Sequence, residues 1–315
     1  MYDPKKAHYV VVTGIIHKDG KFLITKRSAD QKAFPNRWAV PGGKLEVHEV
    51  KAKSIVTKSN LPATDYVINP YVGCQHACTY CYAEFMKRFT NHIEPWGQFV
   101  DAKINALEVL GNTEKIRGKK VLLSSVTDPY HPIEAKYKLT RKIVEALIPA
   151  QPNIEILTKS RMVTRDIDLL KQYDNATVGI SLAILDEQLS RQLEPLTASP
   201  RLRIEAIKKC KEAGLRTYVF LSPIFPHISE IDEIIEASKD YVDYFMFENL
   251  NVRPNNQARV FDFIKQNRPE LLEEYKEIYL KKNNTYWDEL KEKITQLCNK
   301  HRKEARFCFH HGSPK

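Results

Sequence analysis

The sequence lacks the long apolar runs and leader-like segments that direct a chain to a membrane. No stretch approaches the roughly 20 consecutive apolar residues that are needed to cross a bilayer. The first residues, Met1 to Lys6, contain no apolar segment resembling a secretory signal. We therefore expect a cytoplasmic protein without membrane association, and we take it to be a monomer.

Dense basic runs, low-complexity tracts and tandem repeats are also missing, although the formal net charge is +10. Clustered Lys and Arg side chains attract phosphates, but here they alternate with Asp and Glu. The charge is thus compatible with a nucleic-acid partner and equally with a solvated basic surface. The content of 43% hydrophobic and 28% charged residues is typical of a globular chain.

The first 47 residues differ in pattern from the rest of the chain. Two β-rich stretches, 9–16 and 22–25, flank Asp19-Gly20, a typical hairpin turn. Together with Trp-Ala-Val-Pro-Gly-Gly at 38–43, this pattern resembles the N-terminal part of a Nudix hydrolase. Gly43 and Glu49 match the first half of the Nudix box. Residues 57–62 read Thr-Lys-Ser-Asn-Leu-Pro, where the carboxylates that bind the metal belong. We interpret residues 1–47 as a truncated, inactive Nudix-like fragment and expect the functional domain at 48–315.

From about His48 onward, short apolar runs alternate with amphipathic helical stretches. Repeated strand–helix units of this length imply parallel strands joined by right-handed crossovers. We predict an α/β fold, a partial (β/α)6 TIM-like barrel, followed by a charged helical extension over 269–303. The expected strands are 66–69, 120–124, 154–158, 177–181, 217–221 and 244–247, and the expected helices are 140–147, 165–173, 200–213 and 230–239.

Three of the six cysteines, Cys74, Cys78 and Cys81, form a Cys-x3-Cys-x2-Cys run directly after the first predicted strand of the barrel. Such clustering without a secretory signal favours metal ligation over disulfides. Three thiolates can hold three irons of a [4Fe–4S] cluster, which leaves the fourth iron open to the amino and carboxylate groups of S-adenosylmethionine. The alternative is structural zinc, which needs a fourth ligand and usually a second cysteine pair.

The Cys-x3-Cys-x-aromatic-Cys form, with Tyr80 before the last cysteine, is typical of radical S-adenosylmethionine (radical SAM) proteins. Over residues 48–315 the chain resembles the spore photoproduct lyase-related members of that family. The resemblance implies a [4Fe–4S] cluster, S-adenosylmethionine and a reductant of the flavodoxin or ferredoxin type. It also implies reductive cleavage of S-adenosylmethionine and hydrogen abstraction from a substrate left open by the sequence, a nucleic acid with a lesion being one candidate. The phrases that carry it are 65–74, 81–83, 127–134, 157–160, 165–168 and 193–195.

The same resemblance implies roles for residues at the carboxyl ends of the predicted strands, where barrel enzymes place their chemistry. Tyr80 would lie by the adenine, Lys159 would pair with the methionine carboxylate, and Ser181 would contact the ribose. Three further residues would stand near the methionine amino group: Ser124, Ser125 and Thr127.

Asp128 and Tyr130, in the second βα loop, are the predicted catalytic residues. Spore photoproduct lyase carries a hydrogen-donating cysteine where this chain has Ser125, and a serine O–H bond is too strong to replace it. Repair of a thymine dimer by that route is therefore not expected, although the phenol of Tyr130 could substitute. Weaker candidates for substrate contact are His131, Glu134, Glu194, Glu248 and Arg253.

The remaining three cysteines give weaker indications of function. Cys210 is expected in a helix core, whereas Cys298, Cys308, His310 and His311 are either a second metal site or unrelated packing and tail residues. Two rival functions stay open: a Nudix-type nucleoside diphosphate hydrolase, and a non-catalytic, zinc-bearing protein that binds nucleic acid.

Overall fold

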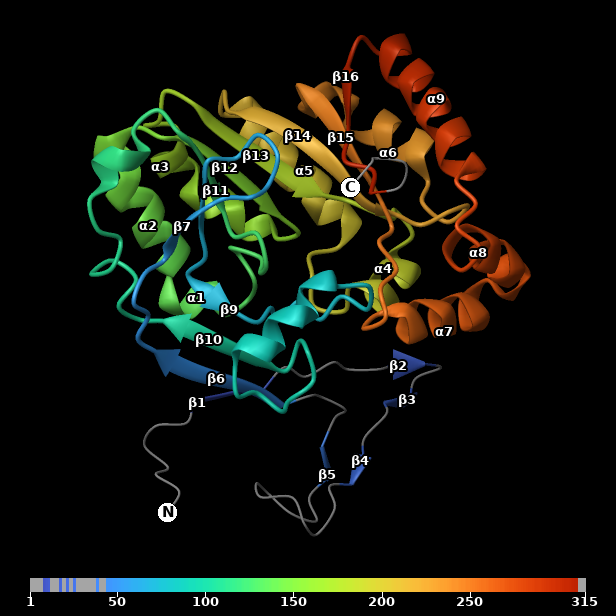
Figure 1. Ribbon diagram of the computed structural model, residues 1–315, viewed down its shortest axis with the longest axis horizontal. Helices are drawn as coiled ribbons and strands as arrows, with labels where there is room; N and C mark the ends of the chain where they lie inside the picture. The colour runs from blue at the N-terminus through green and yellow to red at the C-terminus, as the bar shows by residue number, and fades with distance from the viewer. Residues whose placement is uncertain are drawn as a thin grey trace.

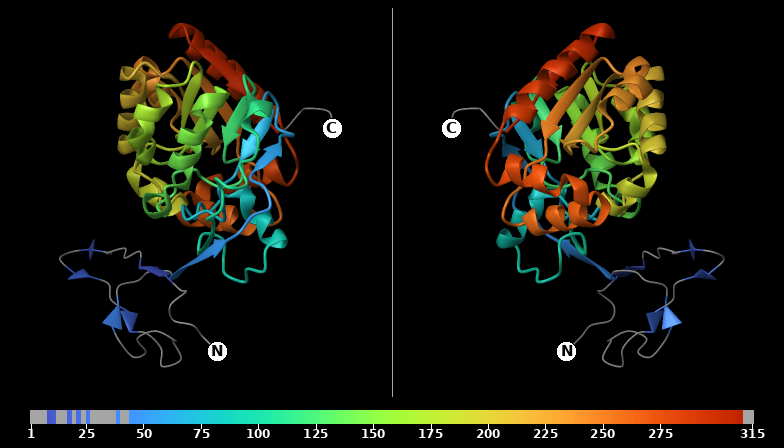
Figure 2. Two further views of the ribbon diagram at one scale, coloured as in Figure 1. Left: turned by 90° about the vertical axis from the view of Figure 1, so that its left-hand side faces the viewer. Right: turned by 90° about the vertical axis from the view of Figure 1, so that its right-hand side faces the viewer.

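The computed structural model describes residues 44–310 and, before them, residues 8–11, 17–18, 21–22, 25–26 and 38–39, with side chains from residue 45 onward. Its main feature is an eight-stranded sheet with the order β16-β15-β14-β13-β12-β11-β8-β7, curved into an open barrel (Figures 1 and 2). All neighbours pair in parallel except β7, which is antiparallel to β8. The strands are β7 (Val56–Lys58), β8 (Tyr66–Ile68), β11 (Lys120–Leu123), β12 (Asn153–Thr158), β13 (Ala176–Ser181), β14 (Arg216–Ile224), β15 (Tyr244–Asn249) and β16 (Glu304–Phe307).

The outer face of this sheet forms the main core with the helices that follow the strands. Alternate strand residues such as Ile156, Ile180 and Val219 point outward and pack against Ile143 and Ile207. The other residues of the same strands line the concave face, where Tyr218 and Tyr244 stack with ring centroids 4.9 Å apart. The helices on the outer face are α2 (Leu139–Leu147), α3 (Ile167–Leu170), α5 (Pro200–Glu212), α6 (Ile231–Ser238) and α9 (Thr285–Lys300).

The remaining helices connect the strands or flank the mouth of the barrel, at the carboxyl ends of the parallel strands. They are the 3-10 helices η1 (Tyr82–Phe89), η2 (Thr113–Ile116), η3 (Ile148–Ala150), η4 (Arg161–Asp166), η5 (Lys239–Tyr241) and η6 (Pro269–Leu271), and the α-helices α1 (Glu134–Tyr137), α4 (Glu187–Leu193), α7 (Gln257–Asn267) and α8 (Leu272–Tyr279). A second core of residues from α4, α7, α8 and the loop of Tyr80 closes this end.

A smaller sheet, in the order β1-β6-β10-β9, lies beside the mouth (Figure 1). Its strands are β1 (His8–Val11), β6 (Lys44–Val50), β9 (Tyr71–Val72) and β10 (Phe99–Lys103), and β6 pairs with β10 in parallel. Leu45, Val47 and Val100 are buried in a small core of their own. The predicted boundary between residues 47 and 48 falls inside β6.

The six predicted barrel strands are confirmed, and so is the α/β barrel fold. Two edge strands, β7 and β16, were not predicted. Of the predicted Nudix-like hairpin, β2 (His17–Lys18) and β3 (Lys21–Phe22) pair around Asp19-Gly20, and β4 (Thr25–Lys26) pairs with β5 (Trp38–Ala39). The predicted strand 9–16 is wrong in its pairing: residues 9–11 belong to β1, which pairs with β6 and not with 22–25. Residues 12–16, 19–20, 23–24 and 40–43 lie outside the described residues. In the part of the chain that is described, no helix combines the length and the apolar character needed to cross a membrane.

Candidate functional site

The three clustered cysteines lie in the loop between β9 and η1, at the carboxyl end of β8. The loop turns tightly: the Cys81 amide donates to the Cys78 carbonyl at 3.1 Å, and Ala77 has a φ of 53°. Gly73, before the first cysteine, has a φ of 81°, and a Cβ there would lie 2.4 Å from the Phe99 carbonyl oxygen. No other residue fits at position 73, because both the backbone conformation and the space exclude a side chain.

The three thiols of the loop are not already spaced for one zinc ion. Among the described residues, the only group of three or more potential ligands with all ligand atoms within 4.8 Å of one another is elsewhere, at His48, His92 and Glu94. At least one pair of the loop's sulfurs is therefore more than 4.8 Å apart, whereas tetrahedral Zn–S bonds require roughly 3.8 Å. An iron–sulfur cluster, in which each thiolate binds a different iron, does not require the closer spacing.

Burial, with Asp128 and Cys81 nearby, raises the pKa of the Cys74 thiol to about 12. Burial also raises the pKa of Cys78 and of Cys81. Metal binding to this loop must therefore displace thiol protons.

Unpartnered polar atoms surround the cysteine loop. Both side-chain polar atoms of Gln75 and the hydroxyls of Thr79 and Ser124 are buried and have no hydrogen-bond partner within the described part of the chain. A buried polar group without a partner costs about 1–3 kcal/mol, so such atoms are rare in native proteins unless a ligand or water satisfies them. Polar groups and thiols together fit an iron–sulfur cluster with a polar cosubstrate beside it.

Lys159, at the end of β12, faces the loop from across the mouth. Its ammonium donates to the Ser181 hydroxyl at 2.8 Å and lies 5.8 Å from the centre of the Tyr80 ring. Lys159 also lies 4.0 Å from the buried carboxylate of Glu194. Three predicted cosubstrate contacts, on three different elements, are thus brought together.

Glu194 and Arg203 hold this group in place. Arg203 is fully buried and donates to Glu194 and, at 3.1 Å, to the Ser181 carbonyl oxygen. The Tyr80 hydroxyl donates to the other Glu194 oxygen. Burial opposes ionisation of Glu194, but the charges of Arg203 and Lys159 and the hydrogen bonds lower its pKa below the usual value. The carboxylate therefore orients both the lysine and the tyrosine.

The Asp128 carboxylate is largely buried and has several hydrogen-bond partners, so it is not free to face the substrate. It accepts hydrogen bonds from the Thr158 hydroxyl at 2.6 Å and from the Lys159 amide at 2.8 Å, and His76 lies 3.4 Å away. Burial alone would raise its pKa, but His76 and these hydrogen bonds keep the pKa of Asp128 low. The carboxylate fixes the Lys159 backbone and the His76 ring of the cysteine loop.

The residues after β11 contact the loop through different atoms. Ser124 has a φ of 66°. The Ser125 amide donates to Asn69 at 3.0 Å, and its carbonyl accepts from the Tyr82 hydroxyl at 2.8 Å. Thr127 donates to the Gly73 carbonyl at 2.5 Å, so its hydroxyl holds the loop.

Tyr130, His131 and Glu134 are fully buried, and two of them adjoin the loop and Asp128. The Tyr130 amide donates to Asp128 at 2.8 Å, and burial together with the charge of His76 lowers the pKa of His131. Tyr130 is buried in the main core with its ring 5.8 Å from the Arg165 guanidinium. Glu134 accepts from the Tyr71 hydroxyl at 2.5 Å and from Arg165 at 2.8 Å, inside the fold. The catalytic role of Tyr130 stays a prediction, and this placement lends it no support.

At the far side of the mouth, Glu248 on β15 accepts from Ser222 and lies 2.8 Å from His310. Cys298 is buried in the main core, whereas Cys308 packs on the concave face with Tyr218 and Tyr244. The two cysteines belong to separate clusters, and His311 lies outside the described residues.

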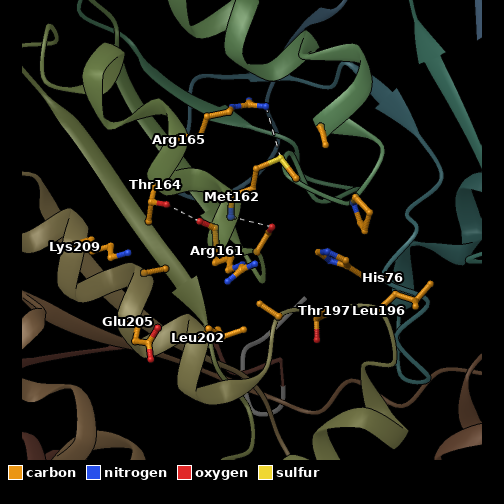
Figure 3. A pocket seen from close by; sticks show the side chains of 15 residues that line it. His76, Arg161, Met162, Thr164, Arg165, Leu196, Thr197, Leu202, Glu205 and Lys209 are labelled. Atoms are coloured by element: carbon orange, nitrogen blue, oxygen red, sulfur yellow. Dashed lines mark hydrogen bonds between the residues drawn. The ribbon is translucent and has the colours of Figure 1, made fainter. Parts of the chain in front are cut away.

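A cavity of about 730 Å³ adjoins the loop on its helical side (Figure 3). His76 reaches it from the loop, η4 contributes Arg161 and Thr164, and α5 contributes Glu205 and Lys209. Lys159 and Ser181 do not line it, so the cavity is separate from the mouth of the barrel.

The sequence predicted Glu194 only as a candidate for substrate contact and His76 only as a possible fourth ligand of a zinc ion, and it gave no role to Arg203. Arg203 occupies an inward position of α5, which was interpreted only as an amphipathic helix. An arginine on the apolar side of that helix was the available signal, because such a charge needs a buried partner. His76 had no signal beyond its place between two cysteines.

Comparison with known proteins adds a family match. Residues 68–240 match the family model described as the Radical SAM superfamily. An uncharacterized protein of Methanocaldococcus jannaschii is 38% identical over 230 residues, which cover 73% of this chain and 86% of that protein. A radical SAM Nalpha-GlyT isomerase of Pseudomonas phage M6 is 27% identical over 194 residues, 61% of this chain and 38% of that protein.

Among solved structures, a spore photoproduct lyase mutant has a similar fold. Its TM-score is 0.65 at 15% identity, covering 84% of this chain and 82% of that one. The same lyase complexed with dinucleoside spore photoproduct gives a TM-score of 0.63. At this identity, the similarity establishes the fold alone.

Proposed function

The chain belongs to the radical SAM superfamily and is a radical SAM enzyme, and from this premise we propose which of its residues carry the reaction. Cys74, Cys78 and Cys81 hold the [4Fe–4S] cluster, and Lys159 and Ser181 bind S-adenosylmethionine. The observation that carries the proposal is the contact of Lys159 with Ser181 beside Tyr80, across the mouth from the cysteine loop.

When bound, the reduced cluster supplies the electron that cleaves the sulfonium of S-adenosylmethionine. The protein's own contribution is binding and orientation. The Lys159 ammonium is placed to attract the methionine carboxylate, since a buried cation pairs readily with an anion. Ser181 offers a hydroxyl to the ribose, Ser124 offers its unpartnered hydroxyl to the amino group, and Tyr80 presents its ring to the adenine. Ser125 and Thr127 support this role by tying the strand end to Asn69 and to the loop.

Anaerobic reconstitution tests the cluster. We expect about four irons with matching sulfide per chain, and the Cys78→Ala variant should lose them. The reduced wild type should form 5′-deoxyadenosine slowly without added substrate. One zinc per chain bound by sulfur, without sulfide, would contradict the assignment.

The Lys159→Ala variant tests the cosubstrate site. Its affinity for S-adenosylmethionine should fall by about tenfold or more, because a charge-assisted hydrogen bond is lost. Lys171→Ala, an exposed lysine after α3, is the matched control and should bind as the wild type does. Equal affinity in both variants would remove Lys159 from the site.

We further propose a nucleic-acid substrate. The helix η1, which starts directly after Cys81, exposes Tyr82, Phe85 and Phe89, and the Arg88 guanidinium lies 4.7 Å from the Phe89 ring centre. Exposed aromatic rings beside cations are the platform on which single-stranded nucleic acids stack, at about 1–3 kcal/mol per base. The formal net charge of +10 is consistent with this.

Fluorescence anisotropy with a labelled single-stranded oligonucleotide tests this surface. Phe89→Ala should weaken binding about fivefold to a hundredfold. Leu280→Ala, a half-exposed apolar residue outside η1, is the control and should bind as the wild type does. Binding that is unaffected by Phe89→Ala, or absent at low salt, would contradict the proposal.

The residue at position 125 affects which DNA lesion the protein can repair. Because its hydroxyl is a poor hydrogen-atom donor, we expect little turnover of DNA containing spore photoproduct. Anaerobic assays of the wild type and of Ser125→Cys compare the two donors. Fast repair by the wild type would contradict the expectation, whereas repair only by the cysteine variant would support it.

We also propose that the protein is cytoplasmic and that a flavodoxin or ferredoxin supplies the electron to the cluster.

Finally, we propose that the N-terminal segment 1–47 is an inactive Nudix-like fragment. Residues 57–62, where Nudix carboxylates belong, contain the last two residues of β7 and no Asp or Glu. A chain beginning at Lys44, which keeps β6, should retain cluster and cleavage. Hydrolysis of nucleoside diphosphate derivatives with Mg²⁺ by the full chain would contradict this proposal.

A further inference from the structure

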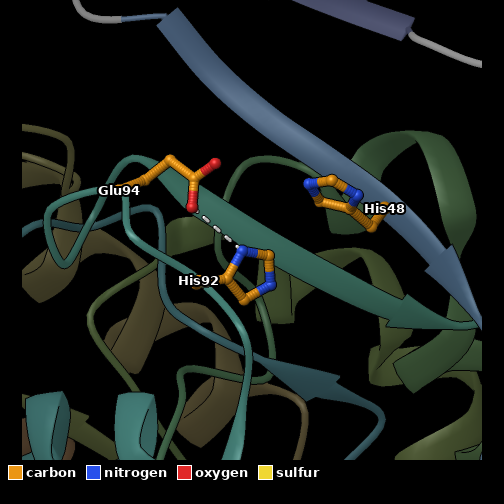
Figure 4. A group of neighbouring side chains, drawn as sticks. All are labelled: His48, His92 and Glu94. Atoms are coloured by element: carbon orange, nitrogen blue, oxygen red, sulfur yellow. Dashed lines mark hydrogen bonds and ion pairs between the residues drawn. The ribbon is translucent and has the colours of Figure 1, made fainter. Parts of the chain in front are cut away.

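Two histidines and a glutamate meet beside the small sheet, away from the cysteine loop. His48 comes from β6, and His92 and Glu94 come from the segment between η1 and β10 (Figure 4). One ligand atom from each of the three lies within 4.8 Å of those of the other two. The His48 side chain is exposed and the other two are half-buried, so an ion could reach them from solvent.

His92 is held between two carboxylates. Its Nε2 lies 2.8 Å from an oxygen of Asp101, which is nine-tenths buried, and its Nδ1 lies 3.1 Å from Glu94. An ionised carboxylate only accepts hydrogen bonds, so Nε2 carries the proton that Asp101 accepts. Without a metal ion, a doubly protonated ring would donate to Glu94 through Nδ1 in the same way; with a metal ion bound, Nδ1 presents its lone pair to the ion beside the Glu94 carboxylate.

The ring of His92 is also fixed in orientation. It stacks on Phe99 with centroids 3.9 Å apart and planes inclined by 19°. A histidine whose far nitrogen is bound by a buried carboxylate, and whose near nitrogen points at other ligands, is the arrangement of metal-ligating histidines in proteins. Asp101 takes the place of the outer carboxylate.

We propose that His48, His92 through Nδ1, and Glu94 form a zinc site, with Asp101 orienting His92 and water as the fourth ligand. Two imidazoles and one carboxylate are a ligand set that Zn²⁺ prefers, whereas Mg²⁺ and Ca²⁺ prefer oxygen. Zinc bonds of about 2.0–2.2 Å require ligand atoms about 3.4 Å apart. The three ligand atoms, which lie within 4.8 Å of one another, must move closer to reach that spacing, and the exposed side chain of His48 has room to turn.

The zinc would hold residues 92–99 in place, and this segment packs against the cysteine loop. It links β6 to residues 92–94, and His92 stacks on Phe99. The Phe99 carbonyl and ring contact Gly73, next to Cys74, and Trp96 packs edge-on against Phe99 with centroids 5.7 Å apart. We assign this zinc a structural role because it would join β6 to residues 92–94; the ligand set itself, three protein ligands and a water, is the pattern of catalytic zinc.

The test uses the full chain with its iron–sulfur cluster in place, so that the cysteines are not free to bind zinc. Elemental analysis after dialysis should give about one zinc per chain in the wild type. Zinc-edge X-ray absorption should show a shell of nitrogen and oxygen only. His48→Ala, an exposed substitution, and His92→Ala should lose the zinc while keeping the iron.

Two further variants sharpen the test. Asp101→Asn keeps an acceptor for Nε2 but removes the charge, and it should weaken zinc binding about 10–100-fold. His227→Ala is the matched control, because His227 also pairs with a glutamate, Glu274 at 2.7 Å, but has no second histidine beside it. Among the described residues, His227 belongs to no group of three potential ligands, so His227→Ala should keep the zinc.

Three outcomes would overturn the proposal. Sulfur in the zinc shell would place the ion at the cysteine loop. Zinc content unchanged by His48→Ala and His92→Ala would place it elsewhere. A wild type that takes up no zinc in titration would mean that a proton, not a metal ion, sits between His92 and Glu94.

Discussion

The mouth of the barrel and the small sheet each gather histidines, carboxylates and cations, but they do so in opposite ways. At the mouth, Glu194 and Arg203 are buried and neutralise each other, so the protein fixes Lys159 and Tyr80 before any ligand arrives. At the small sheet, His48 is exposed and only Asp101 is well buried. The first site is organised by internal charge pairs, whereas the second needs an ion to complete it.

Removing one partner of the internal pair should have the largest effect. Arg203→Met leaves Glu194 buried without its main counter-charge, and we expect unfolding to become easier by about 3–5 kcal/mol. Arg191→Ala, whose exposed pair with Glu187 spans 3.4 Å, is the control, with an expected cost below about 1 kcal/mol. Denaturant midpoints give the comparison. Similar small shifts in both variants would show that the mouth is not organised by this pair.

Gly73→Ala tests whether the loop depends on the small sheet. The new Cβ would lie 2.4 Å from the Phe99 carbonyl, and the φ of 81° is strained for alanine. We expect a loss of about 2–4 kcal/mol and reduced iron content. Gly111→Ala shares the positive φ, 70°, but meets nothing within 4 Å, and should cost only about 1–2 kcal/mol. Equal losses would mean that contact with Phe99 is unimportant.

Acid should lower the stability of the barrel through His131. Burial, with the charge of His76 nearby, lowers the pKa of His131 to about 3. The unfolded chain takes up this proton below about pH 6.5, so the stability from the neutral ring is complete above that pH. It is lost as the pH falls toward 3, by about 2 kcal/mol at pH 5.

His131→Phe should remove the loss of stability that protonation of His131 causes. The free energy of unfolding, measured between about pH 7 and pH 5, should then fall less steeply than in the wild type. A slope unchanged by His131→Phe would show that other groups carry the effect.

The smallest change is expected for Tyr130→Phe. The ring packs in the main core, so the rate of 5′-deoxyadenosine formation should stay within about twofold and stability within about 1.5 kcal/mol. Anaerobic single-turnover assays measure the rate. A large loss of rate at unchanged stability would support the catalytic role predicted from the sequence.

Local patterns predicted most of the barrel because each strand and helix carries its own periodicity. The Cys-x3-Cys-x2-Cys loop needed only eight consecutive residues. By contrast, β16 was not predicted, because the strand Glu304–Phe307 is short and polar at alternate positions. Its partner β15 also lies about 60 residues earlier in the chain, much farther than an ordinary connection between neighbouring strands. The pairing of His48 with His92 was equally hidden, since strand pairing and not sequence spacing brings them together. Arg203 appeared as an ordinary basic residue until its partner Glu194 was seen.

The late arrival of β16 has a consequence for synthesis of the chain. The cysteine loop and the strands up to β15 leave the ribosome before residues 304–307 are made. Until then β15 presents an open edge of N–H and C=O groups, which can recruit other strands. Residues 304–307 therefore cover the edge of β15 with a short, charged edge strand, and premature truncation before Glu304 would leave the longer edge of β15 free to pair with other strands and aggregate.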